Sequence, residues 1–384
     1  MMTPSSIHLA GLLRPHYALL AMVLFASQAA SAADFWAYVG TYTNAGSKGI
    51  YLYRFQPGSG RLAPAGLAVE TSNPTFVIAD QKQRHIYAVN EDAQGGVSAF
   101  TIDPATGKLT LLNRVSTRGN GPCHLALDRT GRWLAAANYG SGSFAVFPVK
   151  DDGSLGESVA FVQHTASGPN VNRRGPHAHC ALFSADNRFL LVADLGLDHV
   201  MVYRFDPATG AVTPNDPPFG SVPTGAGVRH FVFHPNGRYL YAVDEIQSAV
   251  TTFSWDAARG ALEPLQTVST LPAGFKGNSS GAEVAIGIGG THLYASNRGN
   301  DTIALFSIDP QHFTVTPMEY TPALVKTPRH FIIDPTGKYL LAEGQDSGDI
   351  AIFKLNAHTG QMTPDPRLTV QLSRPVCIVF VPRH

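Results

Sequence analysis

A strand–turn–strand unit repeats along most of the chain and limits the possible folds more than any other feature. Each copy has an apolar segment, a polar turn, a second apolar segment and usually a final Asn or Asp. Six copies are visible, at residues 75–90, 123–138, 179–194, 229–244, 283–297 and 329–344. The residue that follows the turn recurs at intervals of 47 to 56 residues. A period of this size is typical of propellers and solenoids.

A second motif, an apolar residue followed by a short turn and a further strand, occurs seven times. In six copies the turn contains glycine, which tolerates the positive φ that tight hairpins need. These glycines are Gly60, Gly107, Gly153, Gly210, Gly260 and Gly360. Phe313 occupies the glycine position in the remaining copy. We therefore expect a different turn at Phe313.

Each period thus holds four short strands and no helical apolar pattern. Residues 33–384 divided among seven repeats leave about 50 residues for each, which suits a four-stranded blade. Residues 35–55 resemble a blade without its first strand, and residues 375–381 resemble that strand. The predicted fold is all-β, a single seven-bladed β-propeller with four antiparallel strands per blade. The N- and C-terminal strands are expected to share one blade and close the ring, which leaves no open sheet edge.

The first 32 residues have the features of a secretory signal peptide. Arg14 precedes a short apolar run at residues 17–25, and small residues at 30–32 form an A-x-A cleavage site. This run is too short to cross a bilayer. We expect an exported chain, with the periplasm as its compartment, and no membrane span in the mature part. Residues 33–384 would form the propeller domain.

Charge content argues against a nucleic-acid partner. Lys and Arg number 28, Asp and Glu also number 28, and only 15% of residues are charged. Binding to phosphate backbones needs a clustered surplus of positive charge. The three cysteines, Cys123, Cys180 and Cys377, are an odd number in a long chain, so we interpret them as small strand residues. The composition gives no indication of an oligomeric state.

Polar residues recur where strands of neighbouring blades would meet. In a blade, the start of the first strand and the end of the second reach the same face. Aligned copies place Thr75, Cys123, His179, Arg229, Ala282 and Arg329 in one slot near the first strand's start. The slot after the second strand holds Glu91, Tyr139, Leu195, Glu245, Arg298 and Gln345. A purely structural slot would carry similar residues, so this variation predicts a functional site at one mouth of the central channel.

Glu245, Arg229 and Arg298 are the first candidates for catalysis. Arg229 and Glu245 lie at the two ends of one hairpin and can pair, which leaves a simple salt bridge as one interpretation. Alternatively, the carboxylate accepts a proton while guanidinium groups hold a substrate anion. Arg298 follows the second strand of the next blade and is harder to explain by packing.

His177 and His179 belong to the segment Gly-Pro-His-Ala-His and point the same way along a strand entry. Two such histidines can bind a metal, catalyse proton transfer, or serve the structure. Zinc would need a third strong ligand nearby, so no metal and no cofactor is expected.

The neighbouring slot contains further candidates for substrate binding. His124, His230 and Glu283 lie in it, and His330 repeats the histidine. Recurrence of histidine at one slot also fits a structural role. Arg329, which precedes His330, is a candidate for anion binding.

The chain resembles the seven-bladed lactonase family, which includes propeller-type bacterial 6-phosphogluconolactonases and fungal carboxy-muconate lactonizing enzymes. The resemblance covers essentially the whole predicted mature chain, from residue 39 to residue 382. Its most specific segments are Val-Gly-Thr-Tyr-Thr at 39–43, Gly-Pro-His-Ala-His at 175–179, Val-Arg-His-Phe at 228–231, Asp-Glu at 244–245, Ser-Asn-Arg-Gly at 296–299 and Pro-Arg-His-Phe at 328–331.

The resemblance implies a metal-free active site at the channel mouth. It implies that Glu245 is the acid/base carboxylate, that Arg229 and Arg298 hold an anion, and that the catalytic histidine is His177 or His179. The expected activity is hydrolysis of a lactone ring in a small, anionic sugar-acid lactone, as in 6-phosphogluconolactonase. Two alternatives stay open: a muconate-type lactonizing cycloisomerase, and a non-catalytic propeller that binds a ligand or protein. The expected export is a departure, because a phosphorylated lactone is a cytoplasmic substrate.

Overall fold

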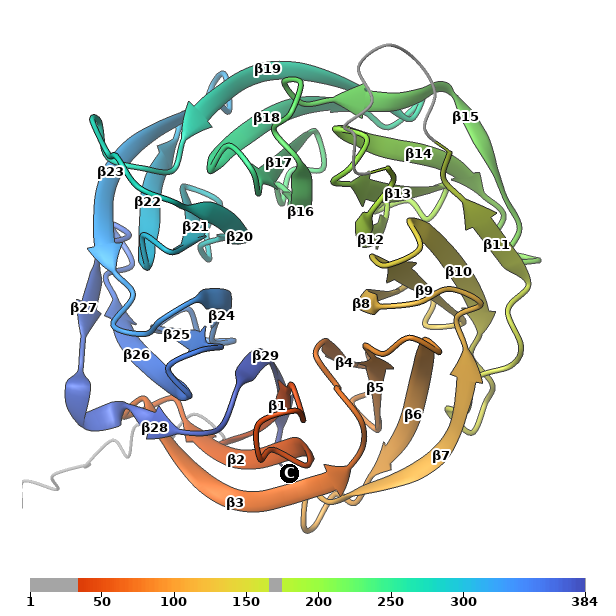
Figure 1. The fold of residues 1–384 in the computed structure, drawn as a ribbon, viewed down its shortest axis with the longest axis horizontal. Coiled ribbons are helices and arrows are strands. Elements are labelled where there is room, and N and C mark those ends of the chain that lie inside the picture. Colours follow the sequence, from red (N-terminus) through yellow and green to blue (C-terminus); the bar gives the residue numbers. More distant parts are fainter. Residues whose placement is uncertain (1–33, 166–174, 384) are drawn as a thin grey trace, which may run out of the picture. The chain divides into compact units, whose positions relative to one another are not determined.

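The computed structural model describes residues 34–165 and 175–383. The predicted signal peptide, residues 1–32, lies outside the described residues. Within them the strands form seven sheets arranged as blades around a central axis (Figure 1). The prediction of an all-β, seven-bladed propeller with antiparallel blades is therefore confirmed.

Each blade has its innermost strand at the axis, and the other strands follow outwards. From the axis, blade 1 contains β29 (Pro375–Pro382), β1 (Phe35–Thr41), β2 (Gly49–Gln56) and β3 (Arg61–Glu70). Blade 2 contains β4 (Val77–Ala79), β5 (His85–Asn90), β6 (Gly96–Ile102) and β7 (Leu109–Ser116). Blade 3 contains β8 (Pro122–Leu127), β9 (Trp133–Asn138), β10 (Ser143–Pro148) and β11 (Ala160–Gln163). Blade 4 contains β12 (Ala178–Phe183), β13 (Phe189–Asp194), β14 (His199–Phe205) and β15 (Val212–Ser221).

The remaining blades follow the same order. Blade 5 contains β16 (Val228–Phe233), β17 (Tyr239–Asp244), β18 (Ala249–Asp256) and β19 (Ala261–Ser269). Blade 6 contains β20 (Ser280–Ile286), β21 (His292–Arg298), β22 (Thr302–Ile308) and β23 (Val315–Pro322). Blade 7 contains β24 (Pro328–Ile333), β25 (Tyr339–Gly344), β26 (Asp349–Leu355) and β27 (Met362–Pro364). The short helix η1 (Pro366–Leu368) leads to β28 (Val370–Gln371), which also pairs with β26.

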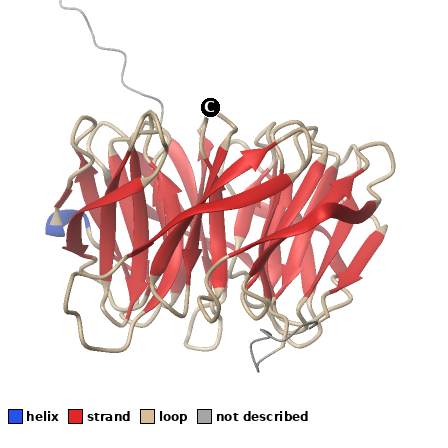
Figure 2. Ribbon diagram, turned by 90° about the horizontal axis from the view of Figure 1, so that it is seen from above, coloured by secondary structure: helices blue, strands red, loops and turns tan. Residues whose placement is uncertain are grey.

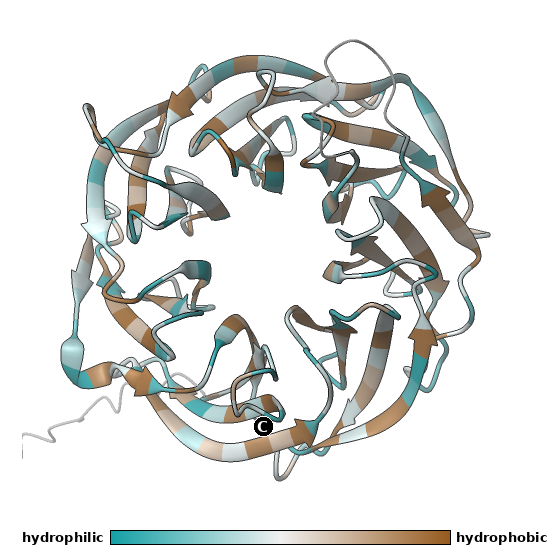
Figure 3. Ribbon diagram, viewed as in Figure 1, coloured by the Kyte–Doolittle hydropathy of each residue, from teal (hydrophilic) through white to brown (hydrophobic). Residues whose placement is uncertain are grey.

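Each blade packs both of its faces against neighbouring blades, so the core is divided among the blade interfaces. The second strands β5, β9, β13 and β25 are buried at every position. One core cluster joins Phe189 and Val200 of blade 4 to Phe231, Leu240 and Phe253 of blade 5. Figure 3 shows apolar segments along these strands. This burial on two faces explains why the repeats appear as short apolar runs.

The two ends of the chain close the ring as the sequence predicts. β29 pairs antiparallel with β1, from Phe35 opposite Pro382 to Gly40 opposite Cys377. β29 is also in contact with β4 of blade 2 and β24 of blade 7. The last strand of the chain is thus the innermost strand of the first blade.

Removing residues 375–384 is expected to prevent cooperative folding. The truncation deletes the buried side chains of Val376, Ile378 and Val381 and leaves an inner edge of β1 unpaired. Apolar burial of this size contributes about 5–9 kcal/mol, which is comparable to the whole stability of a typical domain. Thermal unfolding followed by circular dichroism measures the effect, with removal of residues 383–384 alone as the control. A truncated chain that melts within a few degrees of the control would contradict the closure.

The expectation of a different turn at Phe313 is wrong. The Phe313 N–H donates to the carbonyl of Asp309, as the Gly210 N–H does to Asp206, and Phe313 has φ 58°. This conformation is unfavourable for a bulky residue. The Phe313 ring stacks on Tyr239 with ring centroids 4.2 Å apart, and this packing offsets the strain.

The propeller has two faces, formed by the loops at the two ends of the strands (Figure 2). Innermost strands begin and second strands end at one of them, which we call the mouth face. The three cysteines lie buried and unpaired in β8, β12 and β29, as predicted. In residues 34–165 and 175–383, no helix has the length and apolar character needed to cross a membrane.

Candidate active site

A β-bulge at the start of the innermost strand places the mouth residues. In blade 5, Val228 pairs with Asp244 and His230 pairs with Val243, so Arg229 is an extra residue between the two pairs. The same shift leaves His179 unpaired in blade 4 and Arg329 unpaired in blade 7. Bulges re-aim side chains and are frequent beside active sites. Because of the bulge, one residue of such a strand lies at the mouth and the next lies at the axis. Strand alternation alone does not predict this arrangement.

Glu245 is held by both predicted arginines. Its Oε2 atom lies 3.1 Å from Nε of Arg229 and 2.8 Å from Nη2 of Arg298. Arg229 also donates to the carbonyl of Ala282, and Arg298 donates to that of Gly281 at 3.0 Å. The structure thus brings these three side chains of blades 5 and 6 together.

Arg229 and Glu245 differ in exposure, and both remain charged at neutral pH. The Arg229 side chain is only 2% exposed, whereas that of Glu245 is 21% exposed. Burial, together with Arg329 and Arg298, lowers the pKa of Arg229 to about 10. Burial alone would raise the pKa of Glu245, but Arg298 and Arg229 hold it below its usual value. The mouth therefore presents a carboxylate that two guanidinium groups neutralise.

His177 and His179 both pack against Tyr139. The His177 ring stacks on Tyr139 at 4.6 Å, and its Nδ1 lies 2.9 Å from the Tyr139 carbonyl oxygen. His179 meets the edge of Tyr139 with centroids 5.5 Å apart and is buried. Burial and then Arg229 lower the pKa of His179 well below 6.5, so the ring is neutral at pH 7. Arg229, Arg329 and Arg298 all act electrostatically on His179.

A second charged cluster lies on the mouth face. It combines Arg329, a predicted anion-binding residue, with Glu91 and Tyr42, which were not among the predicted site residues. Glu91 accepts hydrogen bonds from Tyr42 at 3.0 Å and from Thr75. Arg329 lies 3.9 Å from Glu91 and packs over the Tyr42 ring at 5.6 Å. Arg329 also acts electrostatically on Arg229 and Glu245. In the sequence, Glu91 occupies the same slot after the second strand as Glu245, and this match could have identified Glu91 as a site residue.

The predicted binding residues His124, His230 and Glu283 lie deeper, around the axis. Together with the residues at the same blade slot they form what we call the axial belt, which comprises Phe76, His124, Cys180, His230, Glu283, His330 and Cys377. His230 Nδ1 lies 2.9 Å from Oε2 of Glu283. The His124 ring packs on Phe76 at 4.2 Å, and its Nε2 lies 3.5 Å from Sγ of Cys180. The belt residues line the axis one position deeper along each strand than the mouth residues do.

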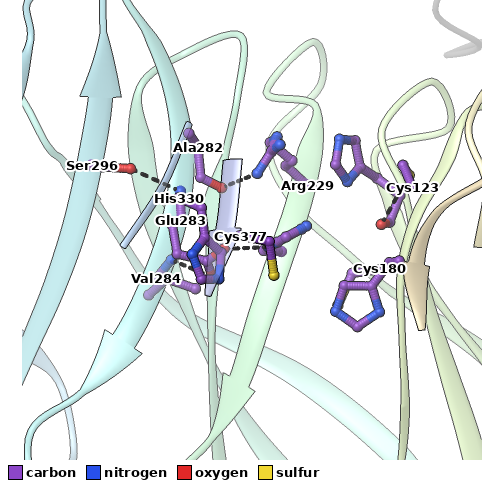
Figure 4. A network of polar contacts seen from close by, with 12 residues as sticks. Cys123, Cys180, Arg229, Ala282, Glu283, Val284, Ser296, His330 and Cys377 are labelled. Carbon is purple, nitrogen blue, oxygen red and sulfur yellow. Dashed lines mark hydrogen bonds and ion pairs between the residues drawn. The ribbon is translucent and has the colours of Figure 1, made fainter. Parts of the chain in front are cut away.

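Figure 4 shows Arg229 beside the Ala282 carbonyl, and Glu283 and His330 close together below it. His330 places Nε2 3.7 Å from Glu283 and Nδ1 2.8 Å from Glu343. Glu343 is fully buried in β25, at a position where blade 5 has Val243. Its role as a partner of His330 was not predicted, because the carboxylate lies inside an apolar strand.

The axial belt carries negative charge beneath the arginines. Burial would raise the pKa of Glu283, but His230 and His330 lower it to about 2. Burial lowers the pKa of His230 to about 4, so His230 is neutral at pH 7. Burial would lower the pKa of His330, but Glu343 raises it above 6.5. An ionised Glu283 therefore faces a neutral His230.

Within the described residues, no group of three or more His, Cys, Asp or Glu side chains has a geometry suited to a metal ion.

Comparison with known proteins supports the resemblance. The model of the family "Lactonase, 7-bladed beta-propeller" matches residues 36–380. A 6-phosphogluconolactonase of Bacillus subtilis is 34% identical over 345 residues, which are 90% of this chain and 97% of the relative. A 6-phosphogluconolactonase of Formosa agariphila is 30% identical over 338 residues, 86% of this chain and 95% of the relative.

Among solved structures, the periplasmic gluconolactonase PpgL of Pseudomonas aeruginosa matches with a TM-score of 0.86 and 32% identity. The match covers 91% of this chain and all of the other one. Family model, curated relatives and solved structure agree over nearly the whole propeller. The chain therefore belongs to the seven-bladed β-propeller lactonase family.

Proposed function

We propose that the protein hydrolyses the ring of a small sugar-acid lactone at the mouth face. The observation that carries the proposal is the contact of one Glu245 oxygen with both Arg229 and Arg298, at 3.1 and 2.8 Å. Two guanidinium groups directed at one oxygen are already arranged to receive the negative charge that develops on an attacked carbonyl. Family membership supports a lactone as the substrate class.

The charges of the mouth favour an anionic substrate. Arg229, Arg298 and Arg329 outnumber the carboxylates Glu245 and Glu91 by one. Guanidinium groups grip carboxylates and phosphates through two parallel hydrogen bonds. A lactone with a carboxylate or phosphate substituent is thus expected to bind better than an uncharged one.

We assign proton transfer to His179 and a holding role to Glu245. Glu245 is engaged by two arginines and has a lowered pKa, which makes it a weak base. His179 is neutral, and an anion bound between the arginines would cancel part of the positive field that lowers its pKa. Neutral imidazole beside the bound lactone can then accept a proton from the attacking water. His179 is preferred to His177 because Arg229, Arg329 and Arg298 act on it electrostatically, beside the proposed anion site.

We further propose that the protein works outside the cytoplasm. The predicted signal peptide supports export, and the similar structure from Pseudomonas aeruginosa is named a periplasmic gluconolactonase. A phosphorylated lactone of central metabolism would then be a poorer match than a lactone available in the periplasm. The fold and its site can be kept while the substrate changes.

The purified mature protein should open at least one lactone faster than the buffer blank. A suitable panel holds glucono-1,5-lactone, a glucarolactone with a free carboxylate, and 6-phosphogluconolactone. We expect the glucarolactone to give the highest kcat/KM, because it is anionic without being phosphorylated. A chelator should leave the rate unchanged, since the proposed steps use protein side chains only.

The same panel distinguishes the alternatives. Muconate-type substrates that close to a lactone, with no hydrolysis of the panel, would favour a cycloisomerase. Saturable binding of lactones without turnover would favour a non-catalytic binding propeller. Loss of activity with chelator would contradict the metal-free assignment.

A further inference from the structure

Two buried histidine nitrogens have no hydrogen-bond partner among the described residues. They are Nδ1 of His179 and Nε2 of His230, and both are covered from solvent. Leaving a buried polar atom unpaired costs about 1–3 kcal/mol. The two rings are neighbours, with centroids 4.9 Å apart and planes at 68°. One ring can therefore supply the hydrogen-bond donor and the other ring the acceptor.

Glu283 determines which nitrogen of His230 carries the proton. Oε2 of Glu283 lies 2.9 Å from Nδ1 of His230, and Glu283 is ionised, so this nitrogen must be the donor. A neutral imidazole has a single N–H, which leaves Nε2 of His230 as an acceptor. That acceptor is matched by an N–H on Nδ1 of His179.

We propose that Glu283 and His230 form a positioning chain that holds His179 in the tautomer needed for catalysis. His179 donates its Nδ1–H through one bridging water to Nε2 of His230, and His230 donates its Nδ1–H to Glu283. Nε2 of His179 is then the free lone pair on the mouth side, and it is not among the covered, unpaired atoms. This inference rests on the proposed function, because it concerns the residue assigned there as the base.

The chain also accounts for the proton during hydrolysis. As the water oxygen bonds to the lactone carbonyl carbon, a water O–H breaks and its proton goes to Nε2 of His179. The resulting imidazolium is stabilised through His230 by the negative charge of Glu283. When the ring C–O bond breaks, the same proton passes to the leaving ring oxygen. The carboxylic acid product then ionises and releases one proton, so no other reactant is required.

The charged groups around the Glu283–His230–His179 positioning chain form two sets. Burial lowers the pKa of His179 most, and Arg229, His230, Arg329 and Arg298 lower it further. His230 meets Glu283 from β20, with the histidine of β24 nearby, and it also packs edge-on against the ring of His124 from β8. Glu283 is in turn shared with His330, whose other nitrogen binds Glu343. The only anionic group in contact with His230 among the described residues is Glu283.

Glu283→Gln tests the chain by removing the charge while keeping the size of the side chain. We expect kcat to fall about 10-fold to 100-fold with KM within twofold, because Glu283 acts through two hydrogen bonds and not directly. The negative charge of Glu283 stabilises protonated His179, so removing that charge lowers the pKa of His179. The acid limb of the pH–rate profile should therefore move to lower pH in the variant. His230→Gln should lower kcat similarly, because it breaks the link between His179 and Glu283.

His85→Gln is the matched control, because His85 pairs with Asp80 at 3.0 Å in a buried site of blade 2. It should lose stability to a similar degree and keep the wild-type kcat and pH profile. A fall in kcat in Glu283→Gln without movement of the acid limb would reduce Glu283 and His230 to structural residues and overturn the proposal. Wild-type kinetics in both variants would also overturn it and leave the proposed function intact. A wild-type protein that opens no lactone would overturn both.

Discussion

Replacing Arg298 by alanine is expected to lower kcat/KM for an anionic lactone about 100-fold to 1000-fold. Arg298 contacts Glu245 at 2.8 Å and its side chain is 16% exposed, so the group can reach a ligand without rebuilding the core. For an uncharged lactone, kcat/KM should fall by only about 10-fold, because the substitution removes only part of the stabilisation of the developing oxyanion. Steady-state kinetics with glucarolactone and glucono-1,5-lactone measure the difference.

The control for Arg298→Ala is Arg367→Ala. Arg367 also pairs with a carboxylate at 2.8 Å, that of Asp365, but it is 87% exposed at the rim of blade 7. Surface pairs of this kind contribute little to stability, and this variant should have wild-type kinetics. Equal losses for the charged and the uncharged lactone in Arg298→Ala would refute the anion-holding role.

Replacing His179 by glutamine should lower kcat about 100-fold to 10,000-fold with little change in KM. The side chain keeps a polar group of similar length but cannot accept a proton at neutral pH. The pH profile of the wild type also tests whether His179 is the base. A base must be unprotonated, and the pKa of His179 lies below 6.5. The wild-type rate should hold below pH 6.5 and decline as the pH falls through the lowered pKa.

His177→Gln provides the comparison for His179→Gln. Its ring stacks on Tyr139 at 4.6 Å and is assigned no proton transfer, so its loss should reduce kcat only several-fold. The assignment of the base would be wrong if His177→Gln abolished turnover while His179→Gln retained it.

The repeat pattern predicts the propeller well because every blade uses the same turn and the same buried strands. The shared slots also place Arg229, Glu245 and Arg298 at one mouth, as the ion pairs confirm. The propeller topology brings the starts of all innermost strands together, so residues far apart in the chain become neighbours without any helix or insertion.

Other parts of the site depend on features that a repeat pattern does not carry. The bulge that frees Arg229 from the strand pairing depends on local backbone geometry. Glu343 lies within an otherwise apolar strand, so only its contact with His330 reveals it. The orientation of Tyr42 toward Glu91 depends on a loop of blade 1 that reaches blade 2. The roles of the mouth residues stay predictions until they are measured.

Proton release by the wild-type protein tests the central claim most directly. Opening a lactone at neutral pH releases one proton per ring, so titration at constant pH follows turnover without a coupled enzyme. The account predicts release well above the blank for glucarolactone, reduced at least 100-fold in His179→Gln. A wild-type rate equal to the blank across the lactone panel would contradict it.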